Sequence, residues 1–273
     1  MKQNIKKFNS LVKKTIFKVQ NKTNNNFNIS NFNKYLITFI ALLFIYLFYL
    51  LIPILYDKTW VQTNIERKLL SEFKLNISSS ADISYRILPA PHFLIKDSKM
   101  LVLANKKIKS IAEIKDLKVF LSQRNFFNKK KISIKKIVIN KANFSLLRSD
   151  LQLLSKITST KFSNNKIKIN NSNIFFKDNS EGIISIIKVD KTVLFFDDKK
   201  ISNFLNLKGE VFNIPFNFKF NNSNNSIKHK NINFRAKLLK LNISNKSITE
   251  KKLTFGENNI SFLNSRVNTK YDI

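Results

Sequence analysis

The segment 35–56 constrains this chain more than any other, because none of its 22 residues carries a charge. It is YLITFIALLFIYLFYLLIPILY, with aromatic residues at both ends, as in membrane-interface belts. At about 1.5 Å per residue, a helix of this length is about 33 Å long, enough to span a bilayer core. A buried helix of a soluble protein is rarely apolar on every face over such a length. We therefore predict a transmembrane helix over 35–56.

The residues before this helix predict its orientation. Residues 1–34 hold eight Lys and no acidic residue, and the positive-inside rule places such a tail in the cytoplasm. The apolar run exceeds a signal-peptide core and no small-x-small motif follows it, which predicts an uncleaved, single-pass anchor of the inner membrane. Residues 57–273 are then periplasmic. Apolar residues at helical spacing in the tail also fit an amphipathic stretch on an anionic leaflet, although a topology signal alone explains them equally well.

The formal charge of +32 at first suggests nucleic acid as a partner. However, the chain has 43 Lys and only 6 Arg, whereas base readers and bidentate phosphate binders favour Arg. It also has 38 Asn, and the abundance of Lys, Asn, Ile and Phe indicates an AT-rich genome. Residues 57–273 keep 41 basic against 17 acidic side chains, which fits anionic lipid head groups or simply a solvated face. We expect no nucleic-acid partner.

The residues that usually carry catalysis are scarce. Without Cys, the chain has no disulfide, thiol nucleophile or Cys-ligated metal. His92 and His229 are the two imidazoles, and neither has a spaced carboxylate or second His of the kind that a metal site needs. The three Gly lie too far apart to build a phosphate-binding loop. We expect no enzymatic activity, no cofactor and no metal.

The region after the anchor begins with one helix and continues in strands. Over 57–75, apolar residues recur every three or four positions, and Asp57 is placed to cap an amphipathic helix. Over 80–273 the period changes to two, which predicts short antiparallel strands with one apolar face. The parity of this pattern flips at Lys135-Lys136, as a bulge or turn requires. Short helical turns are expected near 151–156 and 201–205.

The alternation predicts which side chains share the apolar face of the sheet. The clearest strand is expected over 211–220, VFNIPFNFKF, where Pro215 on the polar side indicates an edge or an unpaired position. The residues that we expect to form a groove or a core on this face are Ile83, Tyr85, Ile87, Phe93, Ile95, Leu117, Val119, Leu121, Ile132, Ile134, Phe144, Leu146, Phe212, Ile214, Phe216, Phe218 and Phe220.

The order of these features resembles the AsmA family of Gram-negative envelope proteins. Members start with a basic tail and one inner-membrane helix, as this chain does. The segments that carry the resemblance further are IERKLLSEFKLNI (65–77), ADISYRILPAPHFLIKDSKM (81–100), AEIKDLKVFLS (112–122), KISIKKIVINKANFSLLRSD (131–150) and LKGEVFNIPFNFKF (207–220). The match is good over about 35–150 and looser beyond. Most members are longer, so the chain is similar to a short or truncated member.

The resemblance implies an elongated antiparallel sheet curled into a groove, after one membrane helix and one amphipathic helix. Related bridge-like lipid-transfer proteins hold acyl chains in such a groove, and AsmA-like proteins are implicated in phospholipid transport and outer-membrane biogenesis. The expected partners are therefore the lipid bilayer and phospholipid acyl chains.

Periodicity does not separate an open groove from the closed core of a sandwich. Apolar runs such as GIISIIKV (182–189) and TVLFF (192–196) favour some closed packing. A membrane-tethered scaffold or outer-membrane assembly factor with a closed β core therefore remains an alternative function.

Overall fold

The computed structural model describes residues 31–80, 82–104, 107–124, 126–150, 159–223, 227–250 and 253–273. The amphipathic stretch of the basic tail and the helical turn expected near 151–156 lie outside these ranges. The chain divides into two units between Tyr49 and Leu50, and the second unit holds the whole sheet.

The predicted membrane segment is helical. Helix α2 spans Asn31–Leu51 and continues as the 3-10 helix η1, Ile52–Leu55. Together they form a helix of 25 residues that is long and apolar enough to cross a membrane. Pro53 lies in the first turn of η1, where the α-helix gives way to the 3-10 helix near the end of this segment.

The amphipathic helix forms close to the expected bounds, as α3, Lys58–Phe73. The Asp57 carboxylate accepts a hydrogen bond from the Trp60 N–H over 2.8 Å, which satisfies a donor that the helix leaves unpaired. Lys74 adopts the left-handed conformation that ends many helices.

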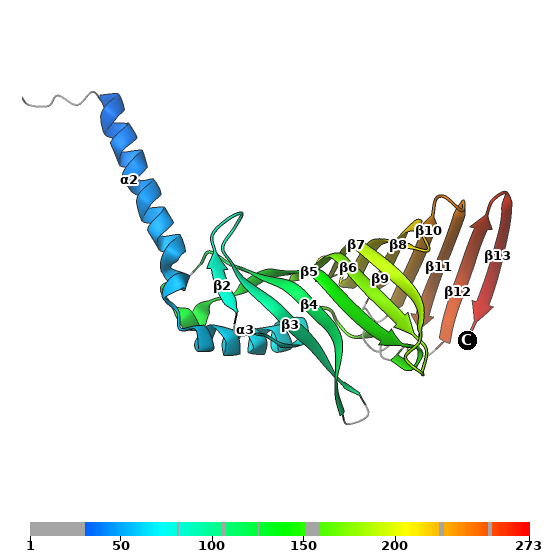
Figure 1. The fold of residues 1–273 in the computed structure, drawn as a ribbon. Helices are drawn as coiled ribbons and strands as arrows, with labels where there is room; N and C mark the ends of the chain where they lie inside the picture. The colour runs from blue at the N-terminus through cyan, green and yellow to red at the C-terminus, as the bar shows by residue number, and fades with distance from the viewer. Residues whose placement is uncertain are drawn as a thin grey trace, which may run out of the picture. The chain divides into compact units, whose positions relative to one another are not determined.

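The rest of the second unit is one sheet of 13 strands, and Figure 1 shows them following one another from β3 to β13. The sheet does not close on itself. Its order follows the sequence, except that β1 and β2 both pair with β3. The strands are β1 Asn76–Ser78, β2 Ile83–Arg86, β3 His92–Ala104, β4 Lys107–Leu121, β5 Ile134–Leu147, β6 Lys166–Lys177, β7 Ile183–Asp197, β8 Ser202–Val211, β9 Ile214–Ser223, β10 Lys228–Ala236, β11 Leu241–Glu250, β12 Leu253–Phe262 and β13 Ser265–Asp272.

One strand pair departs from the expected antiparallel sheet. β5 and β6 are parallel, whereas every other pair in the described sheet is antiparallel. A parallel pair needs a connection that returns the chain to the end at which the first strand began. Residues 148–165 make this connection, which we call the crossover segment.

Irregularities in pairing line up across neighbouring strands. The register shifts near Lys135-Lys136, where the sequence predicted a bulge. A second set lies at one level of the sheet: Asp97, Lys141 and Asn171 have positive φ, and β7 carries an extra residue at Asp190. At this level the buried side of each strand passes to residues of the other parity, as in β4, where Ile114 and Leu117 are both buried.

Two predicted elements near the middle of the chain are wrong. The strand expected over 211–220 is the end of β8, a turn, and most of β9. Phe212 and Asn213 both have positive φ and form the two-residue hairpin turn. The helical turn expected at 201–205 is instead the start of β8.

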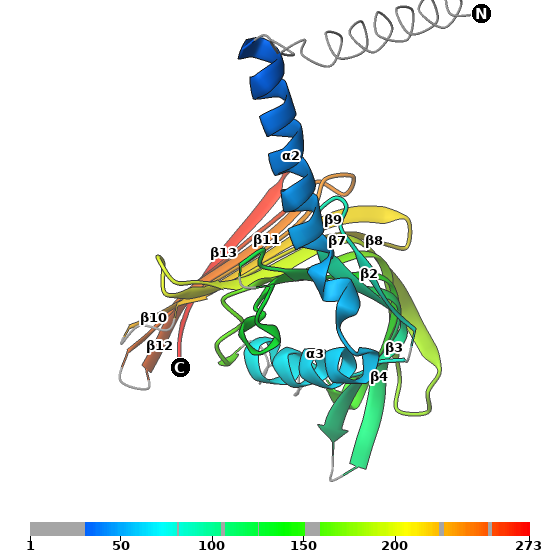
Figure 2. The same ribbon diagram turned by 90° about the vertical axis from the view of Figure 1, so that its left-hand side faces the viewer.

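Helix α3 lies within the curve of the sheet (Figure 2). Its apolar stripe is buried and consists of Val61, Ile65, Leu69 and Phe73. Glu66, on the flank of this stripe, accepts a hydrogen bond from the Ser79 N–H over 2.8 Å. This hydrogen bond joins α3 to the residues that follow β1.

Candidate functional site: an open apolar surface on the sheet

A single row of paired side chains crosses the sheet on one face. Residues that are directly opposite in neighbouring strands point to the same side, so the printed register places a whole row together. This row is apolar on every strand except β7, which contributes Thr192. Its members are Ile83, Ile95, Leu117, Ile139, Ile169, Thr192, Leu207, Phe218, Phe234, Ile243, Ile260 and Val267.

A second row lies two residues further along each strand and is therefore on the same face. It is aromatic or aliphatic from β2 to β10 and then becomes polar. Its members are Tyr85, Phe93, Val119, Ile137, Ile167, Leu194, Leu205, Phe220, Ile232, Asn245, Asn258 and Thr269. We call the side that carries both rows the apolar face, and the other side the polar face.

Helix α3 covers the apolar face at its N-terminal end. Val61 and Ile65 meet Phe93 and Leu121 around a space of about 30 Å³, room for little more than a water molecule. Ile95 and Leu117 in the first row are 0% exposed and Ile139 is 1% exposed. This part of the face is an ordinary closed core.

The side chains of the first row become more exposed from β6 to β13. Ile169, Leu207, Phe218 and Phe234 are half-buried. Exposure then rises to 37% at Ile243, 41% at Ile260 and 55% at Val267. Among the described residues, no helix or loop covers these last strands. We call the apolar face of β6–β13 the open apolar surface.

The crossover segment covers one end of this surface. Phe162, which belongs to it, is buried with Phe196 and Phe220, and Leu205 and Ile232 pack against the three rings. Asn203 of β8 fixes the segment because its side-chain amide bonds the backbone on both sides of Lys161.

Most of the residues predicted to share a face do so. In the strands, the register places Ile83, Tyr85, Phe93, Ile95, Leu117, Val119, Leu121, Ile134, Phe144, Leu146, Ile214, Phe216, Phe218 and Phe220 on the apolar face. Ile132 is buried just before β5, and Ile87 is half-buried just after β2. Residues on β2–β5 belong mainly to the core under α3, and those on β9 to the open apolar surface.

Phe212 is the exception to this agreement. It lies in the β8–β9 turn and is 73% exposed, so it does not join the apolar face. The closed packing expected for 182–189 is also wrong at Ile183, Ile184 and Ile186, which are exposed at the start of β7. Ile243, Ile260 and Val267 were not predicted. β11 and β12 carry scattered apolar residues on both faces, such as Ile243 and Ile248, so their pattern does not single out one face.

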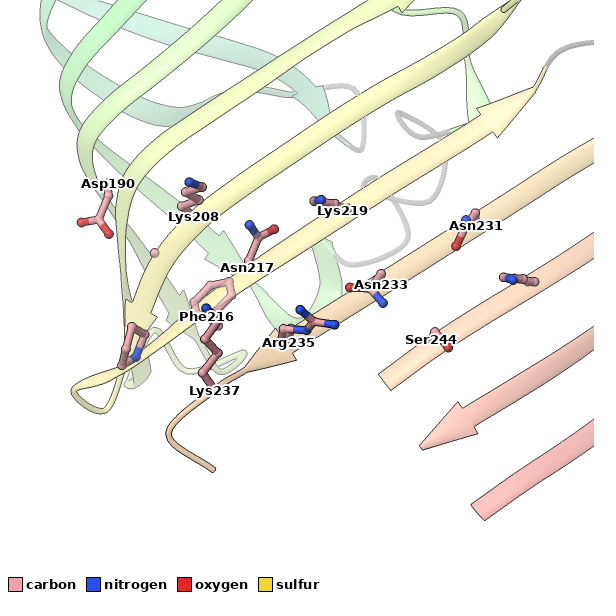
Figure 3. A pocket seen from close by; sticks show the side chains of 13 residues that line it. Asp190, Lys208, Phe216, Asn217, Lys219, Asn231, Asn233, Arg235, Lys237 and Ser244 are labelled. Carbon is pink, nitrogen blue, oxygen red and sulfur yellow. The ribbon is translucent and has the colours of Figure 1, made fainter. Parts of the chain in front are cut away.

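The polar face carries its own hollow of about 820 Å³ (Figure 3). Its lining is basic, with Asp190 as the one acidic side chain among Lys208, Lys219, Arg235, Lys237 and Lys246. The row of paired residues that runs through this hollow is polar on every strand from β5 to β11. It includes Asn140, Asn170, Lys191, Asn217 and Asn242. This is the solvated face that the sequence predicts for its lysines.

The titratable groups with shifted pKa values lie away from the open apolar surface. Burial lowers the pKa of His92, whose ring stacks on Phe120 at 4.8 Å. Burial also raises the pKa of Tyr85, whose hydroxyl donates to the Leu50 carbonyl over 2.7 Å. Within the described residues, no three His, Asp or Glu side chains gather as a metal site. The described residues of the site offer shape and apolar area.

No protein-family model and no curated protein matches this chain.

Proposed function

We propose that the chain is a membrane-anchored, lipid-binding protein of the AsmA type, and that its open apolar surface holds phospholipid acyl chains. The observation that carries the proposal is the first row of the apolar face. Its side chains continue from a core under α3, 0% exposed at Leu117, to a surface that is 55% exposed at Val267. Soluble proteins rarely leave so large a contiguous apolar surface without a ligand or partner.

The dimensions of the surface suit an acyl chain. Neighbouring strands lie about 4.8 Å apart, so the seven spacings from β6 to β13 measure about 34 Å. The acyl chains of one leaflet fill about half of a bilayer core of about 30 Å. Each methylene that the surface shields from water contributes about 0.8 kcal/mol. A chain lying across the strands therefore gains enough to offset its loss of freedom.

In this proposal α2 anchors the protein in the inner membrane, and residues 57–273 lie in the periplasm. The support is the apolar helix together with the eight Lys of residues 1–34, which favour a cytoplasmic tail. The protein then takes part in phospholipid transport and outer-membrane biogenesis by shielding lipid. Carrying a lipid requires no bond to be made or broken, so we propose no catalytic step.

Site-specific photo-crosslinking in cells tests the proposal most directly. A benzoylphenylalanine at Phe234 lies on the open apolar surface, and one at Arg235 lies on the polar face at the same depth of β10. We expect crosslinked phospholipid, detected by mass spectrometry of the purified full chain, at position 234 and not at 235. The pair Phe218 and Lys219 on β9 repeats the comparison one strand away.

The control is the same probe at Ile139, which is 1% exposed beneath α3 and should yield no lipid. Equal lipid crosslinking at 234 and 235 would overturn the proposal, since it would indicate contact with bulk lipid. Crosslinks from 234 to protein alone would favour the scaffold or assembly factor.

A further inference from the structure

The open apolar surface divides into two halves on its last four strands. In the half that continues the first row, β10–β13 present apolar side chains. They are Ile232, Phe234, Leu241, Ile243, Ile260, Phe262 and Val267. Toward the other end of the same strands and on the same face, the side chains are polar. They are Lys228, Lys230, Asn245, Ser247, Thr249, Thr254, Asn258, Thr269 and Tyr271.

The polar half is organised by hydrogen bonds between strands. The Asn245 amide nitrogen donates to Asn258 Oδ1 and to the Tyr271 hydroxyl, each over 2.8 Å. Tyr271 reaches across β12 to make this contact, and its ring lies directly over Gly256. Since the Tyr271 oxygen accepts here, its own O–H can donate to a ligand.

A hollow of about 360 Å³ lies on this polar half. Lys228, Lys230, Asn245 and Tyr271 line it, and Ser159 of the crossover segment stands at its side. Its volume falls in the range of small-molecule sites. Its described lining holds no Asp or Glu side chain, although Ile273, the last residue of the sequence, also lines it. Neither lysine forms an ion pair with a described residue.

We propose that this hollow binds the anionic head group of a phospholipid whose acyl chains lie on the apolar half beside it. The inference rests on the proposed function and specifies that the bound lipid is anionic. An amphiphile placed at the border meets apolar side chains on one side of Ile232 and two ammonium groups on the other. Phosphate oxygens accept charge-assisted hydrogen bonds from Lys228 and Lys230, and a hydrogen bond from the Tyr271 hydroxyl.

The test compares two lipids on the full chain in detergent. The protein is incubated with mixed micelles of equimolar phosphatidylglycerol and phosphatidylcholine, and native mass spectrometry counts the lipids retained. We expect the unaltered chain to retain phosphatidylglycerol over phosphatidylcholine by about thirtyfold, because two lysines near an anionic lipid contribute about 1 kcal/mol each. Lys228→Ser with Lys230→Ser should abolish this preference while total retained lipid stays the same.

The matched control removes two lysines from the polar face instead. Lys219→Ser with Lys246→Ser lowers the net charge equally, and both residues line the hollow on the other side of the sheet. We expect this variant to keep the preference for phosphatidylglycerol. All four lysines are exposed, so neither double variant removes core packing.

The outcomes separate the head-group site from the lipid-binding function. If both double variants lose the preference equally, the cause is general charge and the head-group site is overturned. It is equally overturned if the variant at 228 and 230 keeps the preference. If the unaltered chain retains neither lipid, the proposed function itself fails, and the head-group site with it. Lys228→Glu with Lys230→Glu adds a check, since it should favour phosphatidylcholine.

Discussion

Asn203 holds Phe162 through its side-chain amide. Its Oδ1 accepts a hydrogen bond from the Phe162 N–H over 2.8 Å, and its Nδ2 donates to the Thr160 carbonyl over 2.6 Å. Asn203 and Phe162 are both buried, so water does not replace the bond between them. Because Phe162 closes one end of the open apolar surface, a single polar side chain determines where that surface stops.

Asn203→Ala should therefore destabilise the protein. It leaves the buried Phe162 N–H without its acceptor, which costs about 1–3 kcal/mol. Denaturant unfolding of the full chain in detergent, followed by the fluorescence of the single Trp60, measures the loss. Asn231→Ala removes an exposed asparagine from the polar face and should change the free energy of unfolding by less than about 0.5 kcal/mol. Equal losses in the two variants would contradict this role for Asn203.

The alternation of apolar residues predicted the sheet and its faces, because one-sided burial imposes a period of two. It also located the bulge at Lys135-Lys136, where the parity visibly flips. It misplaced Phe212, because this turn residue has the same parity as Ile214 and Phe216 of β9 and so extends the alternation of that strand by one position. The positive φ at Phe212 is unusual for an aromatic residue, so the sequence gave little sign of the turn.

The open apolar surface could not be predicted because exposure depends on tertiary packing. Leu117 and Ile260 occupy the same row and alternate with polar neighbours in the same way, yet they differ by 41 percentage points in exposure. Leu117 lies on β4, whose apolar face meets α3 at Leu121, whereas Ile260 lies on β12, far along the sheet from that helix. The parallel β5–β6 pair was also hidden, because a helical turn predicted near 151–156 does not indicate whether the strands on either side of it are parallel or antiparallel.

These two positions should respond differently to the loss of side-chain atoms. Leu117→Ala removes a fully buried side chain and leaves a cavity, so we expect a loss of about 2–5 kcal/mol. Ile260→Ala should cost about 1 kcal/mol or less, since much of that side chain already faces solvent. The same unfolding assay compares them. A loss at Ile260 as large as that at Leu117 would mean that β12 is covered in the protein as tested.

The pH dependence of stability should include a contribution from His92. Burial, together with the charges of Lys118 and Arg86, lowers the pKa of this imidazole below its ordinary value of 6.5, although a hydrogen bond from Nδ1 to the Ala90 carbonyl opposes the shift. As the pH falls through about 6.5, His92 therefore binds a proton in the unfolded chain before it does so in the folded chain. The free energy of unfolding should fall as pH drops below about 6.5, by at most about 1.4 kcal/mol per pH unit.

His92→Phe should remove this slope while it keeps the stacking on Phe120. Unfolding curves between pH 5 and pH 8 measure the difference between the variant and the unaltered chain, so that the contribution of the carboxylates cancels. His229→Phe is the control, because His229 is exposed on β10. An unchanged slope in His92→Phe would exclude His92 as its source.

Gly256→Ala should displace Tyr271 from the polar half of the open apolar surface. A Cβ at position 256 would lie 2.1 Å from Cζ of Tyr271, so the ring has to swing away and lose its bond to Asn245. The loss should cost only about 1 kcal/mol of stability, because the ring moves into solvent. A fluorotyrosine at position 271 should shift its ¹⁹F resonance in this variant. Gly182→Ala, in the β6–β7 turn beside Asp178, should leave that resonance in place. If the resonance at 271 is the same in both variants, the ring does not lie over Gly256 in solution.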